Sequence, residues 1–497
     1  MSNAYTSLID HLKRAHRLGT IAGLLGWDEQ VNLPPDSADQ RAEQLALMAE
    51  LHHAAATDPE IGRLLTELET ANARLDADQR VVVARARLDY DRATRLPGEF
   101  AAEKARHSSA AYHAWAAAKQ GNDFAGFAPF LEKHLELAKR EAALQGWGDR
   151  PYDYAIERHD PGMTAEKITA LFAELQAGLV PLVRAVAASP VRAKTEVLRG
   201  FPVAAQKAFL EDVVTRLGFN FRRGRIDVSL HPFCEGAGAD IRMTTRFDAD
   251  NPLDALFSSI HETGHGLYEQ GLPLDRQGTP LGQAVGMGVH ESQSRLWENQ
   301  VARGRAFWRF FEPRFREAFP AQLAGVSSDE LYLAVNAIEP TLIRVDADEI
   351  HYNLHIVLRF ELEQRLFNGE LSVADLPAAW NARSRELLGL TPPDDARGVL
   401  QDVHWSGGAF GYFPSYCIGN MMAAQLWFTV LAALPGVEDD FARGDFSRLL
   451  GWLRTNVHEQ GRRHDTLGLV RQITGEELTP KYLLRYLQER YAPLYLG

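Results

Sequence analysis

The chain has 497 residues, of which 45% are hydrophobic and 24% charged, a composition typical of a soluble protein with a sizeable core. Its formal net charge is −13 and no basic face is concentrated in the sequence, which argues against a nucleic-acid partner. Only two cysteines occur, Cys234 and Cys417, so a disulfide framework is excluded and a reducing, cytoplasmic location is expected.

No segment of the sequence is typical of membrane insertion. The first nineteen residues include Asp10, Lys13 and Arg14 and lack an apolar core, so we expect no signal peptide. The most apolar run, 421–434, is too short to span a bilayer. We interpret it as a buried helix and expect no membrane partner.

Helical periodicity dominates the first third of the chain. Amphipathic patterns rich in Ala, Leu, Glu and Arg predict helices over 5–26, 36–55, 78–93, 98–120 and 124–145. Glycine, proline and aspartate residues indicate a loop between Trp147 and Met163, after which Thr164 opens another helix. Because no linker, low-complexity tract or repeat interrupts the sequence, we expect one domain over 1–497.

Strand-like alternation is confined to 219–247. Within it, residues 220–221, 226–228 and 241–243 predict a small antiparallel ribbon that directly precedes a further helix. The expected fold class is therefore mostly α, with one small antiparallel sheet beside that helix.

The helix after the ribbon carries the sequence His261-Glu262-Thr263-Gly264-His265. Asn251 favours a helix start and Gly271 a helix end, which places His261 and His265 one turn apart. Two imidazoles at this spacing bind one zinc ion, and the glutamate between them points at the water on the metal. Gly264 costs about 1 kcal/mol relative to alanine in a helix. We therefore expect close backbone packing or substrate approach at this position.

A hydrolytic zinc site needs a third protein ligand. Glu269 is excluded on a straight helix, because it lies about 12 Å of helix rise from His261. Glu291 and Glu298, in a helical segment after a glycine-containing loop, are the next candidates. We choose Glu291, because a helix that turns back would offer its opening turn to the metal.

Zinc with a glutamate base is typical of peptide hydrolysis, and an enzyme acting at the C-terminus would need an arginine for the terminal carboxylate. Arg344 is the candidate, on a polar stripe with Asp348, His351 and His355 along a predicted helix. The alternative for Arg344 is an i,i+4 ion pair with Asp348. No glutamate base separates His351 from His355, so we expect hydrogen-bonded histidines there rather than a second metal pair.

A glycine-rich segment further on carries His404, Tyr412 and Tyr416. A histidine and a tyrosine on such a backbone are suited to donate hydrogen bonds to a tetrahedral oxyanion. Aromatic packing with a satisfied histidine is the alternative interpretation.

Five motifs in this order resemble those of the carboxypeptidase Taq family of metallocarboxypeptidases. They are Asp240-Ile241-Arg242-Met243-Thr244, the segment 261–265, His290-Glu291-Ser292-Gln293, Ile343-Arg344-Val345-Asp346-Ala347-Asp348, and 398–405. The resemblance covers most of the chain. It extends to Gly26-Trp27-Asp28-Glu29 near the N-terminus, although Val31 stands where we would expect a threonine.

The resemblance implies a homodimeric, mostly helical metallopeptidase with a deep groove, walled by residues 1–160 and built on a zinc-binding core over 219–430. It implies one zinc ion per chain, with cobalt as a possible substitute, bound by His261, His265 and Glu291, and Glu262 as the general base. It implies the release of single C-terminal residues from peptides with a free C-terminus, with broad preference. Arg344 then anchors the carboxylate, Arg242 and His404 lie in the groove, and Tyr412 serves the oxyanion with Tyr416 in reserve.

Two other functions stay open at this stage. A zinc oligopeptidase would cut internal bonds of short peptides and would therefore accept a C-terminally amidated substrate. A non-catalytic binding protein stabilised by metal would hold its ion with four protein ligands and no exchangeable water.

Overall fold

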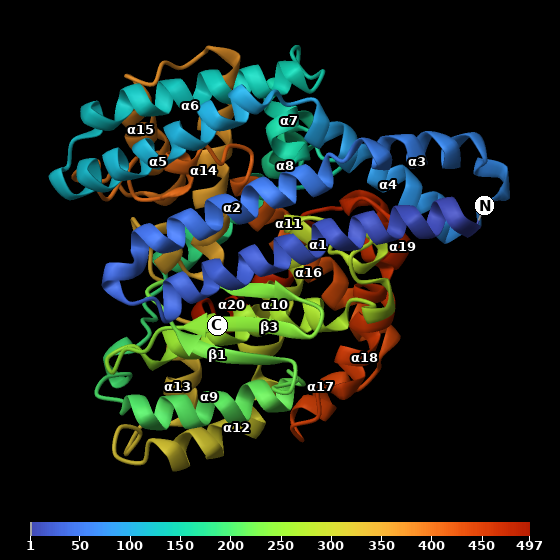
Figure 1. Ribbon diagram of the computed structural model, residues 1–497. Coiled ribbons are helices and arrows are strands. Elements are labelled where there is room, and N and C mark those ends of the chain that lie inside the picture. Colours follow the sequence, from blue (N-terminus) through green and yellow to red (C-terminus); the bar gives the residue numbers. More distant parts are fainter. Residues whose placement is uncertain (1) are drawn as a thin grey trace.

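The computed structural model describes residues 2–497, which form helices throughout and one three-stranded sheet (Figure 1). The helices of the N-terminal half are α1 (Ser2–Val31), α2 (Ala38–Ala56), α3 (Pro59–Thr70), α4 (Ala77–Thr94), α5 (Gly98–Gly121), α6 (Phe124–Leu144), α7 (Pro151–Glu157), α8 (Ala165–Ala188) and α9 (Val203–Leu217). Those after the sheet are α10 (Pro252–Gly271), α11 (Met287–Arg295), α12 (Arg305–Ala318), α13 (Ser328–Val335), α14 (Glu349–Asn368), α15 (Leu376–Leu388), α16 (Phe413–Ala433), α17 (Val437–Phe441), α18 (Ser447–Asn456), α19 (Thr466–Thr474) and α20 (Lys481–Tyr495). The mostly-α prediction is confirmed.

The predicted N-terminal helices are present, with ends that differ by a few residues from those expected. The predicted loop between Trp147 and Met163 is wrong in part, because it contains α7. Pro151 stands in the first turn of α7, where a proline needs no hydrogen-bond partner for its nitrogen, so it begins a helix rather than interrupting one. Thr164 caps α8 as predicted, accepting a hydrogen bond from the Lys167 amide at 3.3 Å.

The sheet is mixed, so the prediction of an antiparallel ribbon is wrong in part. Its strands are β1 (Gly224–Val228), β2 (Cys234–Ala237) and β3 (Asp240–Thr245), in the order β1-β3-β2. β2 and β3 form an antiparallel hairpin, but β1 pairs parallel to β3 because the chain crosses to the far edge of the sheet before β2. Residues 220–221 belong to a turn, in which the Asn220 side chain accepts a hydrogen bond from the Arg222 amide.

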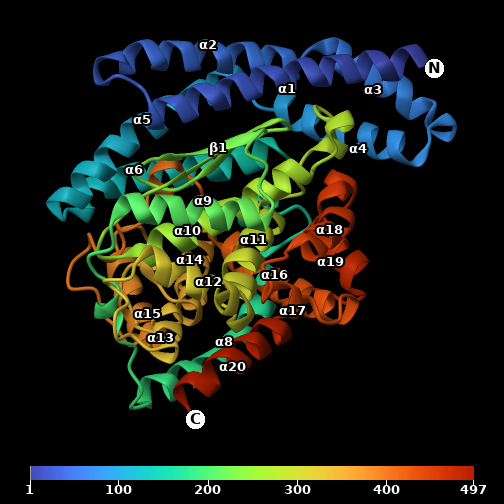
Figure 2. The ribbon, with the colours of Figure 1, turned by 90° about the horizontal axis from the view of Figure 1, so that it is seen from below.

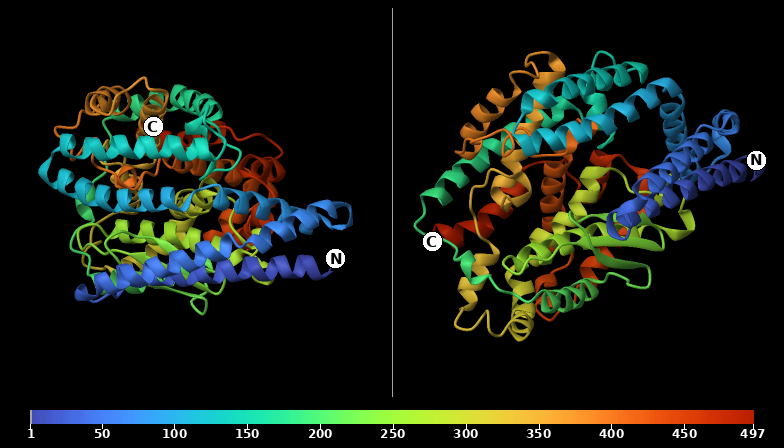
Figure 3. Two further views of the ribbon diagram at one scale, coloured as in Figure 1. Left: turned by 45° about the horizontal axis from the view of Figure 1, so that its top comes forward. Right: turned by 60° about the vertical axis from the view of Figure 1, so that its left-hand side comes forward.

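The sheet lies between two helical layers (Figure 2). α1 and α2 run across its outer face, whereas α9 and α10 lie behind it. A separate small apolar cluster joins α1, α3 and α4, and the large core occupies the rest of the protein. The two termini lie on opposite sides of the molecule (Figure 3).

α10, α11 and α16 pack together at the centre of the large core. Gly419 of α16 allows this approach, because a Cβ atom there would lie 2.5 Å from Glu291 Cγ on α11. By length and composition alone, α8 and α16 are apolar enough to cross a membrane. The segment 421–434 falls mostly within α16, which is a largely buried core helix as predicted.

Candidate metal centre

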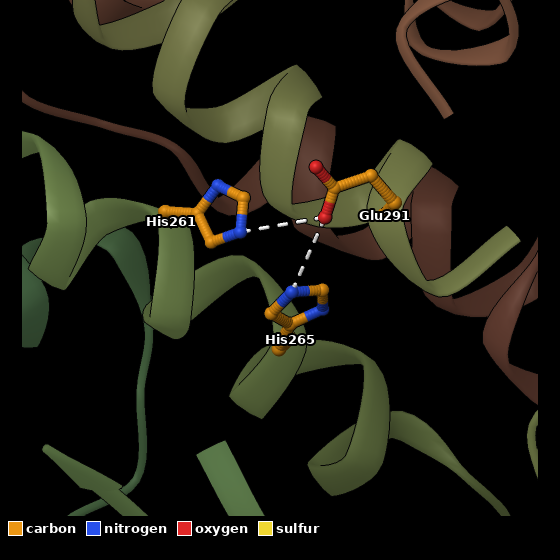
Figure 4. Close-up of side chains that lie close together, drawn as sticks. All are labelled: His261, His265 and Glu291. Carbon is orange, nitrogen blue, oxygen red and sulfur yellow. Dashed lines mark ion pairs between the residues drawn. The ribbon is translucent and has the colours of Figure 1, made fainter. Parts of the chain in front are cut away.

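Two helices bring three potential metal ligands to one point (Figure 4). α10 presents His261 and His265 from successive turns, and α11 turns back beside it to offer Glu291, as predicted. Glu291 Oε2 lies 3.4 Å from His261 Nε2 and 3.5 Å from His265 Nε2. α10 begins after Asn251 as expected, although the Asn251 side chain makes no capping hydrogen bond with the described residues.

The three residues fit a divalent metal ion. Ligand atoms about 2 Å from a tetrahedral ion lie about 3.3 Å from one another, which matches the spacing of Glu291 Oε2 from each histidine. The Nδ1 atoms of both histidines are engaged elsewhere, with Glu298 Oε2 at 2.9 Å from His261 and His290 Nδ1 at 2.6 Å from His265. Such partners orient a ligating imidazole, so each Nε2 is directed to the common point.

A charged layer surrounds these ligands. Arg295 donates to Glu291 Oε1 at 2.7 Å and to Glu298 Oε2 at 3.1 Å. Burial alone would raise the pKa of Glu291, but Arg295 and His261 outweigh it and hold that pKa well below its ordinary value. Glu291 is therefore charged, as a potential metal ligand should be, and the Glu298 carboxylate is engaged with His261 Nδ1 and Arg295.

Glu269 lies outside the ligand cluster, as its distance along α10 predicted. Its Oε1 atom lies 3.0 Å from His290 Nε2, and His290 in turn contacts His265. Glu269 therefore contacts the ligand cluster only indirectly, through the chain of contacts from His290 to His265.

Glu262 stands between the two histidines and is buried, with 7% of its surface exposed. Burial, opposed by the charge of His261, raises the pKa of its carboxyl to about 7. A carboxyl with a pKa near neutrality is suited to accept a proton and return it. A metal ion bound beside it would lower that pKa, since an opposite charge favours the carboxylate.

Arg344 does not lie on a long helix as predicted. It occupies a short 3₁₀ turn, and α14 begins at Glu349 because Asp348 caps the helix by accepting from the Ile350 and His351 amides. Asp348 is therefore not its partner, and the i,i+4 alternative is wrong. Arg344 Nε donates to Asp402 Oδ1 at 2.9 Å and Nη1 donates to the Tyr352 hydroxyl at 2.9 Å.

Arg344, which is buried, forms one group with His404, Tyr412 and Tyr416, which are partly exposed. The Arg344 guanidinium lies 5.0 Å from the centre of the Tyr416 ring, and His404 Nε2 lies 3.1 Å from the Tyr416 hydroxyl. The rings of Tyr412 and Tyr416 are 5.4 Å apart. Burial, aided by the charge of Glu291, raises the pKa of Tyr412 to about 12 and keeps its hydroxyl protonated.

One ring nitrogen of His404 makes no hydrogen bond with the described residues. Burial lowers its pKa to about 3, so the ring is neutral, and its Nδ1 atom is buried without a partner among residues 2–497. An unsatisfied buried atom beside two tyrosines is consistent with a substrate-binding surface.

Arg242 lies apart from the ligand cluster. Its neighbours Ile241 and Met243 are buried, so strand alternation directs Arg242 to the other face of the sheet. There it pairs with Asp240 at 2.9 Å and lies 4.3 Å from the centre of the Trp27 ring on α1. The structure thus links Arg242 with the wall formed by α1.

The remaining histidines of the predicted stripe are hydrogen-bonded, as expected. His351 Nδ1 contacts Asp348, and His355 Nε2 contacts the Thr341 carbonyl. The sequence interpretation missed the roles of Arg295 and Asp402, although the spacing of Arg295 from Glu291 and Glu298 was a usable signal.

A family model described as carboxypeptidase Taq (M32) metallopeptidase matches residues 7–491. Thermostable carboxypeptidase 1 of Thermus thermophilus is 42% identical, and carboxypeptidase 1 of Bacillus subtilis is 38% identical, covering 99% and 98% of both chains. The crystal structure of an M32 carboxypeptidase from Deinococcus radiodurans is similar, with a TM-score of 0.96, 47% identity and full coverage of both chains. Trypanosoma cruzi metallocarboxypeptidase 1 has a TM-score of 0.94 at 34% identity, over 99% of this chain and 100% of that one.

Proposed function

Because the chain belongs to the carboxypeptidase Taq (M32) family of metallopeptidases and is a metallocarboxypeptidase, we propose that it releases single C-terminal residues from peptides with broad specificity. The observation that carries this proposal is the convergence of His261, His265 and Glu291 beside the buried Glu262. Three protein ligands leave a position for water, which is typical of catalytic rather than structural sites.

We propose one zinc ion per chain, with cobalt as a substitute, because two imidazoles and one carboxylate suit both metals. When bound, the ion would supply Lewis-acid character to the scissile carbonyl and to the attacking water. The second carboxylate near His261, on Glu298, adds negative charge that favours a cation at this point.

Glu262 is the proposed general base. Its carboxylate accepts a proton from the attacking water and returns it to the leaving amine, so no net proton is retained. Tyr412 is the proposed donor to the oxyanion and Tyr416 the reserve, while His404 holds the Tyr416 hydroxyl at 3.1 Å.

Arg344 is the proposed anchor for the terminal carboxylate. Asp402 pairs with one side of the Arg344 guanidinium and also with Arg359. Because one carboxylate faces two guanidinium groups, the positive charge of Arg344 is only partly neutralised. A planar guanidinium with remaining N–H groups binds a carboxylate with good geometry. We propose that Arg242 contacts the substrate in the groove beside α1, farther from the ligand cluster than Arg344.

We propose that the whole chain works as one metallopeptidase domain, with residues 1–160 walling the groove and 219–430 carrying the chemistry. Contacts across that boundary support this. Trp115 of α5 donates to the Leu400 carbonyl at 3.0 Å, and His134 of α6 lies 2.8 Å from the Ser406 carbonyl. We also propose a homodimer, which rests on the family resemblance, and a cytoplasmic location, which the two free cysteines support.

A mass-spectrometric time course tests the activity. The zinc-loaded protein is incubated with one peptide and, separately, with its C-terminal amide, each with and without a chelator. The proposal expects a ladder of products that lose single residues from the free C-terminus, absent for the amide and abolished by the chelator. Internal fragments from both peptides would instead show an oligopeptidase, and no cleavage of either would favour a structural metal.

A further inference from the structure

A cavity of about 450 Å³ lies beneath the N-terminal helices and is not part of the ligand cluster. Residues of helices α1, α2 and α4, of the edge strand β2 and of the loop after α10 line it. The polar side chains that line it include His16, His52, Asp89, Tyr90 and Glu235. The cavity has the size of a pocket for a few amino-acid side chains.

β2 connects this cavity with the metal centre. β2, which begins at Cys234, packs against α10, the helix that carries His261 and His265. The next residues, Glu235 and Gly236, line the cavity. The cavity and the ligand cluster therefore lie on elements that pack directly against each other.

The cavity and the proposed carboxylate anchor lie toward opposite ends of the metal centre. Arg344 is linked to the His261 end, because Tyr352 contacts both Arg344 and Arg295, and Arg295 binds the partner of His261. The cavity lies toward the other end of α10, since Gly278, Pro280 and Gln283 of the segment that follows this helix line it. A peptide whose C-terminus lies at Arg344 would direct its upstream residues toward the cavity.

The residues that line the cavity carry carboxylates but no lysine or arginine. Asp89 is already paired with Arg462 at 2.6 Å. Arg242 stands opposite Glu235 in the sheet but pairs with Asp240 instead. Glu235 makes no ion pair or side-chain hydrogen bond within residues 2–497, where its carboxylate accepts a hydrogen bond from the Gly236 N–H. His16 Nε2 is likewise buried without a partner among these residues.

Glu235 is held in this position by α1. A Cβ atom at Gly23 would lie 2.6 Å from Glu235 Oε1, so the glycine lets the carboxylate rest against the helix backbone. Glu235 is exposed to solvent at the edge of the cavity, and partial desolvation of its carboxyl raises its pKa. A partly desolvated carboxylate without a cation is satisfied when a ligand supplies one.

Building on the proposed carboxypeptidase activity, we propose that this cavity is an upstream subsite that binds a cationic group of the peptide substrate opposite Glu235. The cation is a lysine or arginine side chain, or the free amino terminus of a short peptide. The enzyme would then select substrates on charge at a position distant from the residue it removes.

Peptides that share one C-terminal residue test the subsite. A single lysine, or norleucine as its neutral counterpart, is placed two, three or four residues from the C-terminus, with the amino terminus either free or acetylated. We expect about tenfold higher kcat/KM for lysine at one of these positions in acetylated peptides, the scale of one charge-assisted hydrogen bond. The free amino terminus should give a similar gain only in the shortest peptides.

Substitutions of Glu235 test whether its carboxylate causes the preference for lysine over norleucine. Glu235→Gln should remove the lysine preference, and Glu235→Lys should reverse it in favour of glutamate. Glu43→Gln, which removes an exposed carboxylate of α2, should keep the preference and serves as the matched control. Because Glu235 is accessible and unpaired, the melting temperatures of these variants should stay close to that of the unmodified protein.

Two results would overturn the subsite: no difference between lysine and norleucine at any position, or a difference that Glu235→Gln leaves unchanged. Failure of the proposed function is distinct, because then no peptide would lose its C-terminal residue. Calorimetric binding of the same peptides to Glu262→Gln measures the subsite without turnover. There, an equal Kd for the lysine and norleucine peptides would reject the subsite.

Discussion

Gly264 of α10 lies directly against the backbone of Ser294 in α11. A Cβ atom at position 264 would come within 2.5 Å of Ser294 Cα and 2.6 Å of the Gln293 carbonyl oxygen. The glycine between Glu262, the proposed general base, and His265 thus serves backbone packing, one of the two roles expected from its helix cost. This contact brings Glu291 within reach of His261 and His265.

Replacing Gly264 with alanine should therefore separate the two helices. Overpacking of this kind costs about 1–3 kcal/mol, which exceeds the gain of about 1 kcal/mol from alanine in a helix. We expect a lower melting temperature and weaker metal binding, measured by thermal unfolding and by metal competition with a chelator. Gly451→Ala in α18 is the matched control, because its Cβ would meet nothing within 4 Å, and it should stabilise the protein slightly. A Gly264→Ala variant with unchanged metal affinity would contradict the packing role.

Glu262→Gln should abolish proton transfer while leaving the three ligands in place. General-base catalysis contributes typically about 10²–10⁴-fold, so kcat should fall by at least that factor with the metal content unchanged. Elemental analysis and turnover of a free-acid peptide provide the two measurements. Unchanged turnover would reject the role of Glu262, and loss of metal would show that the residue supports the ligands instead.

Arg344 and Arg359 offer a matched pair, because both bind Asp402 and both are buried. Arg344→Lys and Arg359→Lys should each weaken that ion pair. Only Arg344→Lys should weaken binding of a free-acid peptide, by about tenfold or more, while leaving its amide unaffected, since a lysine cannot bind a carboxylate in a bidentate manner. Binding of both peptides to each variant in the Glu262→Gln background is the measurement. Equal losses for acid and amide would exclude Arg344 as the anchor.

The parts of the site that follow local rules could be predicted, and those that depend on distant contacts could not. The spacing of His261 and His265 and the exclusion of Glu269 follow from helix geometry, and Glu291 follows from a helix that turns back beside the first after a connection over 272–286. The surroundings of Arg344 depend on Asp402, which is 58 residues away in the sequence. The N-cap at Asp348 begins the helix after Arg344, although the apolar pattern suggested that the helix includes Arg344. The parallel pairing of β1 with β3 likewise depends on a crossover that alternation alone does not reveal.

Tyr412 and Tyr416 can be separated by removing each hydroxyl. The charge of Glu291 acts on both hydroxyls, but the Tyr416 hydroxyl is already engaged with His404 at 3.1 Å. Tyr412→Phe should therefore lower kcat by about 10²-fold or more with little change in KM, as expected for a donor to the oxyanion. Tyr416→Phe should have the smaller effect on kcat. Steady-state kinetics on one peptide decides between them, and a larger kcat loss in Tyr416→Phe would transfer the role to that residue.

Metal binding should release protons, and the source of each proton can be assigned. Burial opposes a charge on His261, but Glu291 and Glu298 outweigh it and raise its pKa to about 10, so the metal-free ring is protonated at pH 7. Burial lowers the pKa of His265 to about 3, so that ring is already neutral. Because only a neutral imidazole binds a metal, His261 loses one proton, and Glu262 loses the fraction it holds near its pKa of about 7.

We therefore expect release of about one to one and a half protons per zinc ion at pH 7 and an apparent affinity that rises by about tenfold or more for each pH unit. Titration calorimetry in buffers of different ionisation enthalpy measures the number directly. Glu298→Gln removes one of the anions that hold the proton on His261, so its proton release should decline at a lower pH than in the unmodified protein. Zinc binding without proton release between pH 6.5 and 9 would show that His261 is neutral before the metal arrives, and that Glu298 orients the ring without charging it.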